Sequence, residues 1–234
     1  METSPIIPPL GKYFGEARVV TGWLRGRRLE NEIAAHYPGD GRPIMVLPGL
    51  FTTDNRTKML RRVLGKAGYH AVGWGLGRNM PIRADIIERL GVQIEAVQAR
   101  TGAAVTLIGW SLGGLIARAY AQHAPAQVAG VITLGSPFSG DPRSNRAWRA
   151  YEMFADHKVD SPPIDFDRSA KPQVPTVAIW SANDGIIAAQ AARGLPHERD
   201  HEIEIGCGHL AMGCAPEALK AILKLLGEGL PSAR

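Results

Sequence analysis

Short runs of consecutive apolar residues alternate along this chain with longer stretches in which apolar residues recur every three or four positions. The short runs fit strands buried on both faces of a sheet, because they are too short for helices and lack the alternation of a half-exposed strand. The longer stretches fit amphipathic helices with one inward face. We predict strands over residues 43–47, 69–74, 104–108, 128–134, 174–180 and 202–205. We predict helices over residues 11–37, 54–66, 84–99, 111–122 and 215–226.

This alternation of strands and helices predicts an α/β fold. Each helix carries the chain back across the sheet, so successive strands run parallel and helices cover both faces. We expect residues 1–234 to form a single domain around a wound, mostly parallel sheet of about six strands. Residues 1–40 form a helical extension before the first strand, and residues 138–173 form an insertion without a strand. Asp54 is placed to cap the second helix.

The insertion over residues 138–173 is the longest interval without a predicted strand. Three aromatic residues in it, Trp148, Tyr151 and Phe154, are spaced three apart, as on one side of a helix. A connection of this length inside a compact domain is usually functional. We expect a small cap over the active face, and the alternative is a surface excursion whose aromatic side chains pack onto the core.

A serine flanked by glycines stands where the third predicted strand meets a helix. The sequence there reads G-W-S-L-G-G, with Gly109, Ser111 and Gly113 in the pattern G-x-S-x-G. A sharp strand-to-helix turn needs small residues two positions before and after the serine, and it lifts the hydroxyl above the sheet. The N–H groups that begin the helix are free to bind an anion. Ser111 is therefore the candidate nucleophile; an ordinary helix-capping serine would not need both glycines.

A serine hydroxyl needs a base to take its proton and an acid to orient that base. Asp184 follows the strand predicted over residues 174–180, and His209 follows the strand predicted over residues 202–205. The carboxyl ends of parallel strands meet at one edge of a sheet, so these side chains should converge on Ser111. The sequence predicts a triad of these three residues. The alternative acids and bases are Asp165, Asp167, Asp200, His197 and His201.

The oxyanion of acyl transfer needs two N–H donors that are fixed in advance. One candidate is the backbone N–H of Leu112, the residue after the nucleophile. The other is the N–H of Leu50, because Gly49 allows a tight turn directly after the first strand. Only backbone groups are required, so the side chains at these positions carry little information.

Five segments together resemble the α/β-hydrolase superfamily, specifically its compact bacterial serine esterases and lipases. They are LPGLF, GWSLGG, ITLGSPF, SANDG and GHLAMG, and the resemblance covers about residues 43–226. It implies an ester-cleaving site built on Ser111, His209 and Asp184, with a sheet trimmed to about six strands. Many lipases of the superfamily have a His-Gly pair where this chain has Pro48-Gly49, which removes a polar side chain beside the oxyanion hole.

The expected reaction is cleavage of a carboxylic ester through an acyl-enzyme intermediate, without a cofactor. Apolar residues around the expected site favour a hydrophobic ester. The candidates to line the substrate pocket are Phe51, Trp110, Phe138, Trp148, Tyr151 and Phe154. Two alternatives stay open: a lipid deacylase or acyltransferase that acts at a membrane surface, and a hydrolase-fold binding protein without turnover.

Composition and charge narrow the partners. The chain has 27 Lys and Arg against 22 Asp and Glu, a net charge of +5, but the basic residues are scattered and lack interleaved aromatics, so we expect no nucleic-acid partner. One cluster near the N-terminus is either a solvated helix face or an attachment surface for anionic lipid or a partner. The cluster consists of Arg18, Arg25, Arg27 and Arg28.

Cys207 and Cys214 are too few for a disulfide framework, and their spacing with His209 fits no usual zinc pattern, so we expect no metal. The glycine-rich turn over residues 73–79 lacks the fixed spacing of a dinucleotide loop. No apolar run approaches the length of about 20 residues that spans a membrane, and residues 1–10 do not read as a signal peptide. The sequence favours a reducing, cytoplasmic location.

Overall fold

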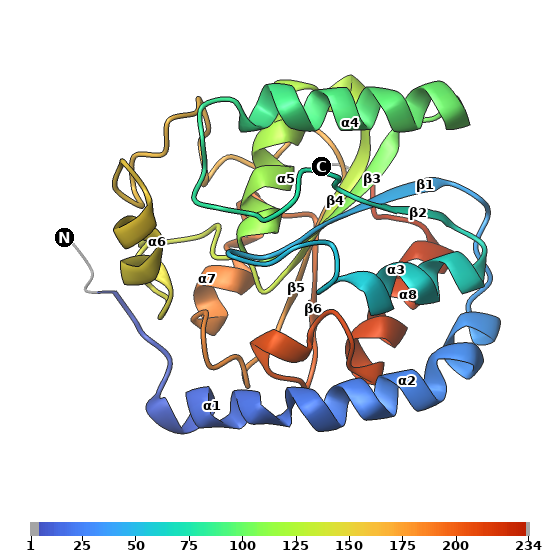
Figure 1. Cartoon of the computed structure of the whole chain (residues 1–234), viewed down its shortest axis with the longest axis horizontal. Helices are drawn as coiled ribbons and strands as arrows, with labels where there is room; N and C mark the ends of the chain where they lie inside the picture. The colour runs from blue at the N-terminus through green and yellow to red at the C-terminus, as the bar shows by residue number, and fades with distance from the viewer. Residues whose placement is uncertain (1–4, 233–234) are drawn as a thin grey trace.

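The computed structural model describes residues 5–232 and contains one six-stranded sheet, shown in Figure 1. All neighbouring strands are parallel, and their order is β2-β1-β3-β4-β5-β6. The strands are β1 (Pro43–Leu47), β2 (His70–Gly73), β3 (Val105–Trp110), β4 (Val128–Leu134), β5 (Thr176–Trp180) and β6 (His201–Glu204). The prediction of a wound parallel sheet of about six strands is confirmed. The strand order reverses between β1 and β3, where ligand sites of such sheets form.

Helices cover both faces of this sheet (Figure 1). In β1, Ile44 and Val46 pack with α2, α3 and α8, whereas Met45 and Leu47 pack with α4 and α5. Successive side chains of a strand point to opposite faces, so a strand between two helical layers must be apolar at every position. The helices are α2 (Val19–His36), α3 (Lys58–Ala67), α4 (Ile86–Thr101), α5 (Leu112–His123) and α8 (Pro216–Glu228).

The chain before β1 is helical, with α1 (Leu10–Gly15), a 3₁₀ turn at Glu16–Arg18, and α2 following one another. The junction residues Gly15 and Arg18 keep right-handed helical backbone angles, so the three pieces form a nearly continuous rod along one side of the molecule (Figure 1).

The connection from β4 to β5 contains one helix, α6 (Trp148–Phe154). Tyr151 on α6 is buried, and its hydroxyl accepts a hydrogen bond from the backbone N–H of Ile82 (3.1 Å) and contacts His157 Nε2 (2.8 Å). The contact with Ile82 ties α6 to the loop that follows β2.

Two local expectations differ from the structure. Asp54 does not cap α3, which begins at Lys58 without a side-chain cap. Instead, the Asp54 carboxylate accepts hydrogen bonds from the backbone N–H groups of Trp74 and Gly75, both at 3.1 Å, just beyond the end of β2. A short helix, α7 (Ala189–Arg193), was not predicted. Within residues 5–232, the helices lack the combination of length and apolar character needed to cross a bilayer.

Candidate active site

Ser111 stands on the turn between β3 and α5 in a backbone conformation that side chains rarely adopt, with φ 54° and ψ −120°. The turn is closed by glycines. A Cβ atom on Gly109 would lie 2.3 Å from the Cα of Gly114, and one on Gly113 would lie 2.6 Å from the carbonyl oxygen of Leu47. Strain of this kind persists only where the surroundings enforce it. The sequence pattern thus corresponds to a physically tight turn.

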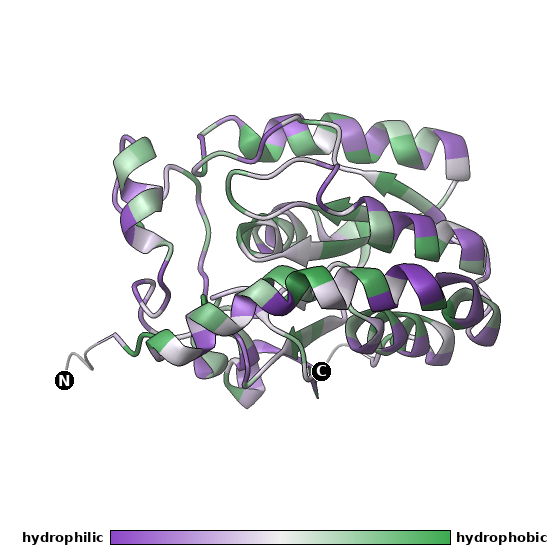
Figure 2. Ribbon diagram, turned by 60° about the horizontal axis from the view of Figure 1, so that its bottom comes forward, coloured by the Kyte–Doolittle hydropathy of each residue, from purple (hydrophilic) through white to green (hydrophobic). Residues whose placement is uncertain are grey.

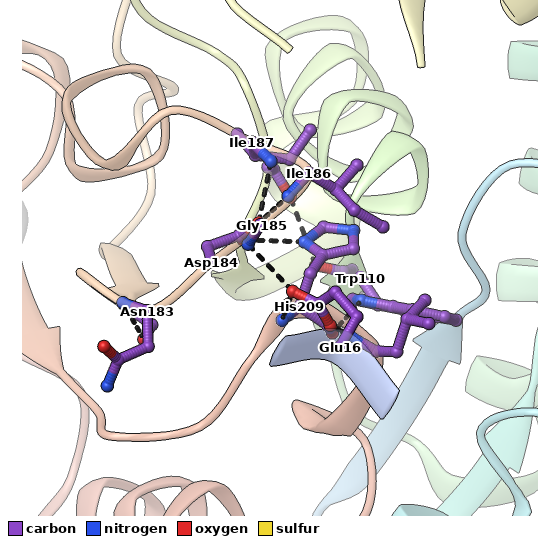
Figure 3. Close-up of polar contacts among 12 residues, drawn as sticks. Glu16, Trp110, Asn183, Asp184, Gly185, Ile186, Ile187 and His209 are labelled. Atoms are coloured by element: carbon purple, nitrogen blue, oxygen red, sulfur yellow. Dashed lines mark hydrogen bonds and ion pairs between the residues drawn. The ribbon is translucent and has the colours of Figure 1, made fainter. Parts of the chain in front are cut away.

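Asp184 and His209 form a buried hydrogen-bonded pair beyond the ends of β5 and β6 (Figure 3). His209 Nδ1 lies 2.7 Å from Asp184 Oδ2, and each residue is 3% exposed. The other carboxylate oxygen accepts from the backbone N–H groups of Ile186 (2.8 Å) and Ile187 (2.7 Å). A carboxylate acceptor keeps a proton on Nδ1, so Nε2 is the nitrogen left to accept one.

The end of β4 links the serine turn to this pair. The N–H of Ser111 donates to the carbonyl oxygen of Leu134 (2.9 Å). A Cβ atom on the next residue, Gly135, would lie 3.0 Å from His209 Nδ1 and 3.1 Å from Asp184 Oδ2. The indole N–H of Trp110, which precedes Ser111, donates to the carbonyl oxygen of His209 (3.2 Å). The structure therefore brings all three predicted triad residues to one edge of the sheet.

The Ser111 hydroxyl has no hydrogen bond within residues 5–232, and it faces a cavity together with Leu50 and Leu112. Leu112 begins α5, so its N–H has no partner within that helix. Catalytic hydrogen bonds are often long in unliganded sites and tighten when substrate binds.

Sequence reasoning missed Glu16, which lies between α1 and α2 and is 5% exposed. Its carboxylate accepts three backbone N–H groups at 2.8 Å each, from Gly185, His209 and Leu210 (Figure 3). One side chain of the N-terminal extension thus joins the turn that carries Asp184 to the turn that carries His209. The signal that could have found it is an acidic residue on the inward face of an amphipathic helix.

Asn79, the last residue of the glycine-rich turn over residues 73–79, holds the loop that contains Leu50. Asn79 is 1% exposed. Its backbone carbonyl oxygen accepts a hydrogen bond from the backbone N–H of Phe51 (2.6 Å), and its backbone N–H donates to the carbonyl oxygen of Thr52 (2.8 Å). Its side-chain Nδ2 donates to the carbonyl oxygen of Pro48 (2.6 Å). Phe51 has a positive φ of 59°, so this clamp supports a strained loop.

Asn79→Ala is expected to lower kcat by about 10- to 100-fold with little change in KM. The N–H of Leu50 is the predicted second oxyanion donor, and loss of such a donor lowers kcat by about 10²–10³-fold, whereas this variant would displace the donor without removing it. Steady-state kinetics on a soluble nitrophenyl ester measures this effect. The control is Arg78→Ala. The exposed Arg78 side chain donates a hydrogen bond of 2.7 Å to the carbonyl oxygen of Phe51, and this variant removes it. Equal losses in both variants would contradict a specific role for Asn79.

The cavity beside Ser111 has a volume of about 60 Å³ and is mostly apolar. Two of the pocket candidates, Trp148 and Tyr151, line it. The further apolar residues around it are Leu50, Ile82, Leu112, Leu115, Pro137, Pro142, Ala147, Val159, Pro162, Phe166 and Ile187.

The other four pocket candidates lie outside this cavity. Trp110 is buried against His209, with ring centroids 5.7 Å apart. Phe138 is buried under the guanidinium of Arg118, 4.2 Å from its ring centroid. Phe51 and Phe154 pack edge to face at 5.1 Å, and Phe154 is 62% exposed. Aromatic character alone did not reveal which face of each element the side chain occupies.

The alternative acid Asp200 and base His201 stand at the amino-terminal end of β6, away from the serine turn. The Asp200 carboxylate accepts from Lys171 Nζ (2.7 Å) and from the N–H of Thr176 (2.8 Å). Asp167 accepts from the hydroxyl of Ser169 (2.6 Å). These partners occupy the two aspartates locally.

Cys207 and Cys214 are free, buried thiols. Burial raises the pKa of Cys207 to about 12 and also raises the pKa of Cys214. Among residues 5–232, no group of three or more His, Cys, Asp or Glu side chains is arranged to hold a metal ion.

Both thiols are expected to react slowly with a disulfide reagent in the folded protein at about pH 8, because a raised pKa leaves almost no thiolate, the reactive form. Both should react rapidly once guanidinium chloride unfolds the chain. Spectrophotometric thiol titration checks this, and a fast native phase would contradict it.

Known proteins resemble this chain in sequence and in fold. The sequence model of the palmitoyl protein thioesterase family matches residues 43–169, more than half of the chain. A curated relative, the pimeloyl-[acyl-carrier protein] methyl ester esterase of Shewanella woodyi, is 29% identical over 111 residues. That alignment spans 47% of this chain and 42% of the relative, so the chain matches less than half of the relative's length.

Solved structures show the same fold. A Bacillus licheniformis lipase superposes with a TM-score of 0.59 at 18% identity, covering 81% of this chain and 94% of the lipase. A Paleococcus ferrophilus monoacylglycerol lipase superposes with a TM-score of 0.57 at 18% identity, covering 82% and 96%. With its six-stranded sheet and a family match over more than half of its length, the chain belongs to the palmitoyl protein thioesterase family.

Proposed function

We propose that this protein cleaves carboxylic esters through a Ser111–His209–Asp184 triad and an acyl-enzyme intermediate. The observation that carries the proposal is the buried Asp184–His209 hydrogen bond of 2.7 Å beside a serine on a glycine-closed turn. A hydroxyl, an imidazole and a carboxylate in this order are what activation of a serine nucleophile requires.

In the first half-reaction, His209 Nε2 takes the proton of the Ser111 hydroxyl while Oγ bonds to the ester carbonyl carbon. The N–H groups of Leu50 and Leu112 hold the resulting oxyanion. The intermediate collapses by breaking the bond to the alcohol oxygen, and His209 donates its proton to that leaving group. Asp184 stays ionised, fixes the imidazole tautomer and stabilises its positive charge.

In the second half-reaction, His209 removes a proton from water, and the hydroxide oxygen bonds to the acyl carbon on Ser111. The same N–H pair holds the second oxyanion. Collapse returns the proton from His209 to Ser111 Oγ and releases the carboxylic acid. No cofactor takes part in these steps.

The acyl group is the part of the substrate that the cavity beside Ser111 suits. Its apolar lining favours a hydrocarbon chain, and residues 138–173 supply part of that lining from α6, which supports their role as a cap. The family name refers to a palmitoyl thioester and the curated relative's name to a methyl ester. Both substrates share an acyl carbonyl, which is the group that the proposed nucleophile attacks.

A change from nitrophenyl acetate to nitrophenyl butanoate is expected to raise kcat/KM by about 10-fold, because each buried CH₂ contributes about 0.8 kcal/mol. Steady-state rates on the graded ester series test this. Ala147 lines the cavity, so the larger side chain of Ala147→Phe should fill part of it. This variant should lose the preference for butanoate over acetate while it still hydrolyses the acetate ester. Equal rates on acetate and butanoate in the unmodified protein would contradict the assignment of the cavity.

The proposed function is tested by ester turnover together with inactivation by a fluorophosphonate. We expect the protein to hydrolyse nitrophenyl esters. This activity should fall to zero when one equivalent of the reagent has reacted per protein chain. A folded protein that neither turns over esters nor reacts with the reagent would favour the alternative of a binding protein.

Deacylation of lipid, or acyl transfer to an alcohol, at a membrane surface is the second candidate function. It uses the same two half-reactions, but in acyl transfer an alcohol takes the place of water as the acceptor of the acyl group. The observation in its favour is a row of exposed apolar side chains on α1 and α2. Product analysis with an added alcohol distinguishes hydrolysis, which releases acid, from transfer, which releases a new ester.

A further inference from the structure

The rod formed by α1, the turn at Glu16–Arg18 and α2 has an outward face that is unusually apolar. Four large apolar side chains on it are between 55% and 73% exposed: Leu10, Phe14, Val20 and Leu24. Tyr13 and Trp23, at 49% and 44% exposure, border this face, because the Tyr13 ring packs under the Arg146 guanidinium and Trp23 lines a groove with Met59 of α3. Figure 2 brings this rod to the front and shows hydrophobic and hydrophilic residues along it. An exposed apolar stripe of this size marks an interaction site.

The inward face of the same rod is already occupied. Gly22 and Gly26 are buried, and a Cβ atom on Gly26 would lie 1.9 Å from the carbonyl oxygen of Cys214. Ile33 belongs to the core under α3 and α8. The apolar residues of the outward face are therefore not needed to hold the rod on the domain.

Basic side chains border the outward face. The exposed basic residues of the rod are Lys12, Arg18, Arg25, Arg27 and Arg28. The acids of the rod face the other way: Glu16 is buried at the active site, Glu30 is buried against Arg62 and Lys66, and only Glu32 is exposed.

Most of these cations are unpaired. Arg25 has a partner, Glu217, at 3.4 Å. Within residues 5–232, Arg18, Arg27 and Arg28 form no ion pair. The border of the apolar stripe thus carries a net positive charge that the domain itself does not neutralise.

We propose that this outward face docks on an anionic lipid bilayer. A helix that lies in the membrane interface places apolar and aromatic side chains below the headgroups and arginines beside the lipid phosphates, and this rod offers both. A second copy of the chain fits the face less well, because a two-fold contact would bring the same unpaired arginines together.

Docking by this face would place the enzyme close to lipid-borne esters. Glu16 on the inward side of the rod binds the turns of Asp184 and His209, so the docking element and the proposed triad are joined directly. The inference names a partner for the proposed enzyme, but lipid binding itself does not require turnover.

The test is flotation of the purified full chain with vesicles of phosphatidylcholine alone or with added phosphatidylglycerol. We expect binding to the anionic vesicles that weakens as salt screens the charges. Phe14→Asp/Leu24→Asp should lower the bound fraction at least about tenfold, and Arg27→Glu/Arg28→Glu should remove the preference for phosphatidylglycerol. The matched controls, Val92→Asp and Arg100→Glu, change exposed residues on α4 and should bind as the unmodified protein does.

All of these variants should hydrolyse a soluble nitrophenyl ester at unchanged rates, which shows that they are folded. Ser111→Ala should lose hydrolysis but keep vesicle binding, so the two proposals fail separately. Absence of flotation, or equal flotation with both vesicle types, would overturn the docking proposal. A dimer in light scattering that Phe14→Asp/Leu24→Asp converts to a monomer would also overturn it, by assigning the face to self-association.

Discussion

Ser111→Ala is expected to lower kcat/KM for a nitrophenyl ester by at least about 10⁴-fold, because removal of a triad nucleophile leaves only binding and oxyanion stabilisation. The fold should be unaffected, since the Ser111 side chain makes no hydrogen bond within residues 5–232 and its backbone conformation is imposed by the turn around it. Steady-state kinetics with a thermal melt of the same preparation measures both properties.

The control for this variant is Ser136→Ala. Ser136 is the buried serine behind the same turn, and among residues 5–232 its hydroxyl donates only to the carbonyl oxygen of Gly109, at 3.4 Å. We expect kcat/KM of Ser136→Ala to stay within about fivefold of that of the unmodified protein, because the variant loses only one weak hydrogen bond. Loss of activity in Ser136→Ala with retention in Ser111→Ala would show that the nucleophile has been misassigned.

Glu16→Ala is expected to lower kcat by about 100-fold, because a displacement of about 1 Å in a catalytic group costs that much. The variant leaves three N–H groups without an acceptor; that of Gly185 belongs to the turn that carries Asp184, and those of His209 and Leu210 belong to the turn that carries His209. Glu16 is a positioning residue, so KM for a short ester should change little and the loss should lie in kcat.

Glu30→Ala is the matched control for Glu16→Ala. Both acids are buried in the same helical rod, but Glu30 binds Arg62 and Lys66 of α3, whereas Glu16 binds the turns of Asp184 and His209. We expect Glu30→Ala to lower the melting temperature while kcat stays within about twofold, since its partners touch no catalytic group. Equal losses of kcat in the two variants would mean that Glu16 acts only through overall stability.

The sheet and the nucleophile turn could be predicted from the sequence because their signals are local. A strand covered by helices on both sides is apolar at nearly every position, as β1 is throughout and β4 is apart from Gly130 and the buried Thr133. The turn at Ser111 needs Gly109 and Gly113 within two residues of the serine, where a short pattern can reveal them.

The contacts that hold the site together are not local, and the sequence alone did not reveal them. Glu16 binds groups 169 and 193 residues away along the chain, and no spacing rule relates such positions. Asp54 had the residue type of a helix cap, but its carboxylate is used across the sheet edge by Trp74. Phe138 is an aromatic residue of the kind expected in a substrate pocket, but it packs on Arg118 instead. The direction of a loop side chain depends on tertiary packing, which the sequence pattern does not show.

The central claim is that Ser111 is the activated nucleophile of this enzyme. Peptide mass spectrometry after complete inactivation by a fluorophosphonate tests it most directly. We predict one phosphonyl group per chain, on Ser111, and no adduct in Asp184→Asn or His209→Ala over the same exposure. An adduct on another side chain, or full turnover after Ser111 has been modified, would contradict the claim.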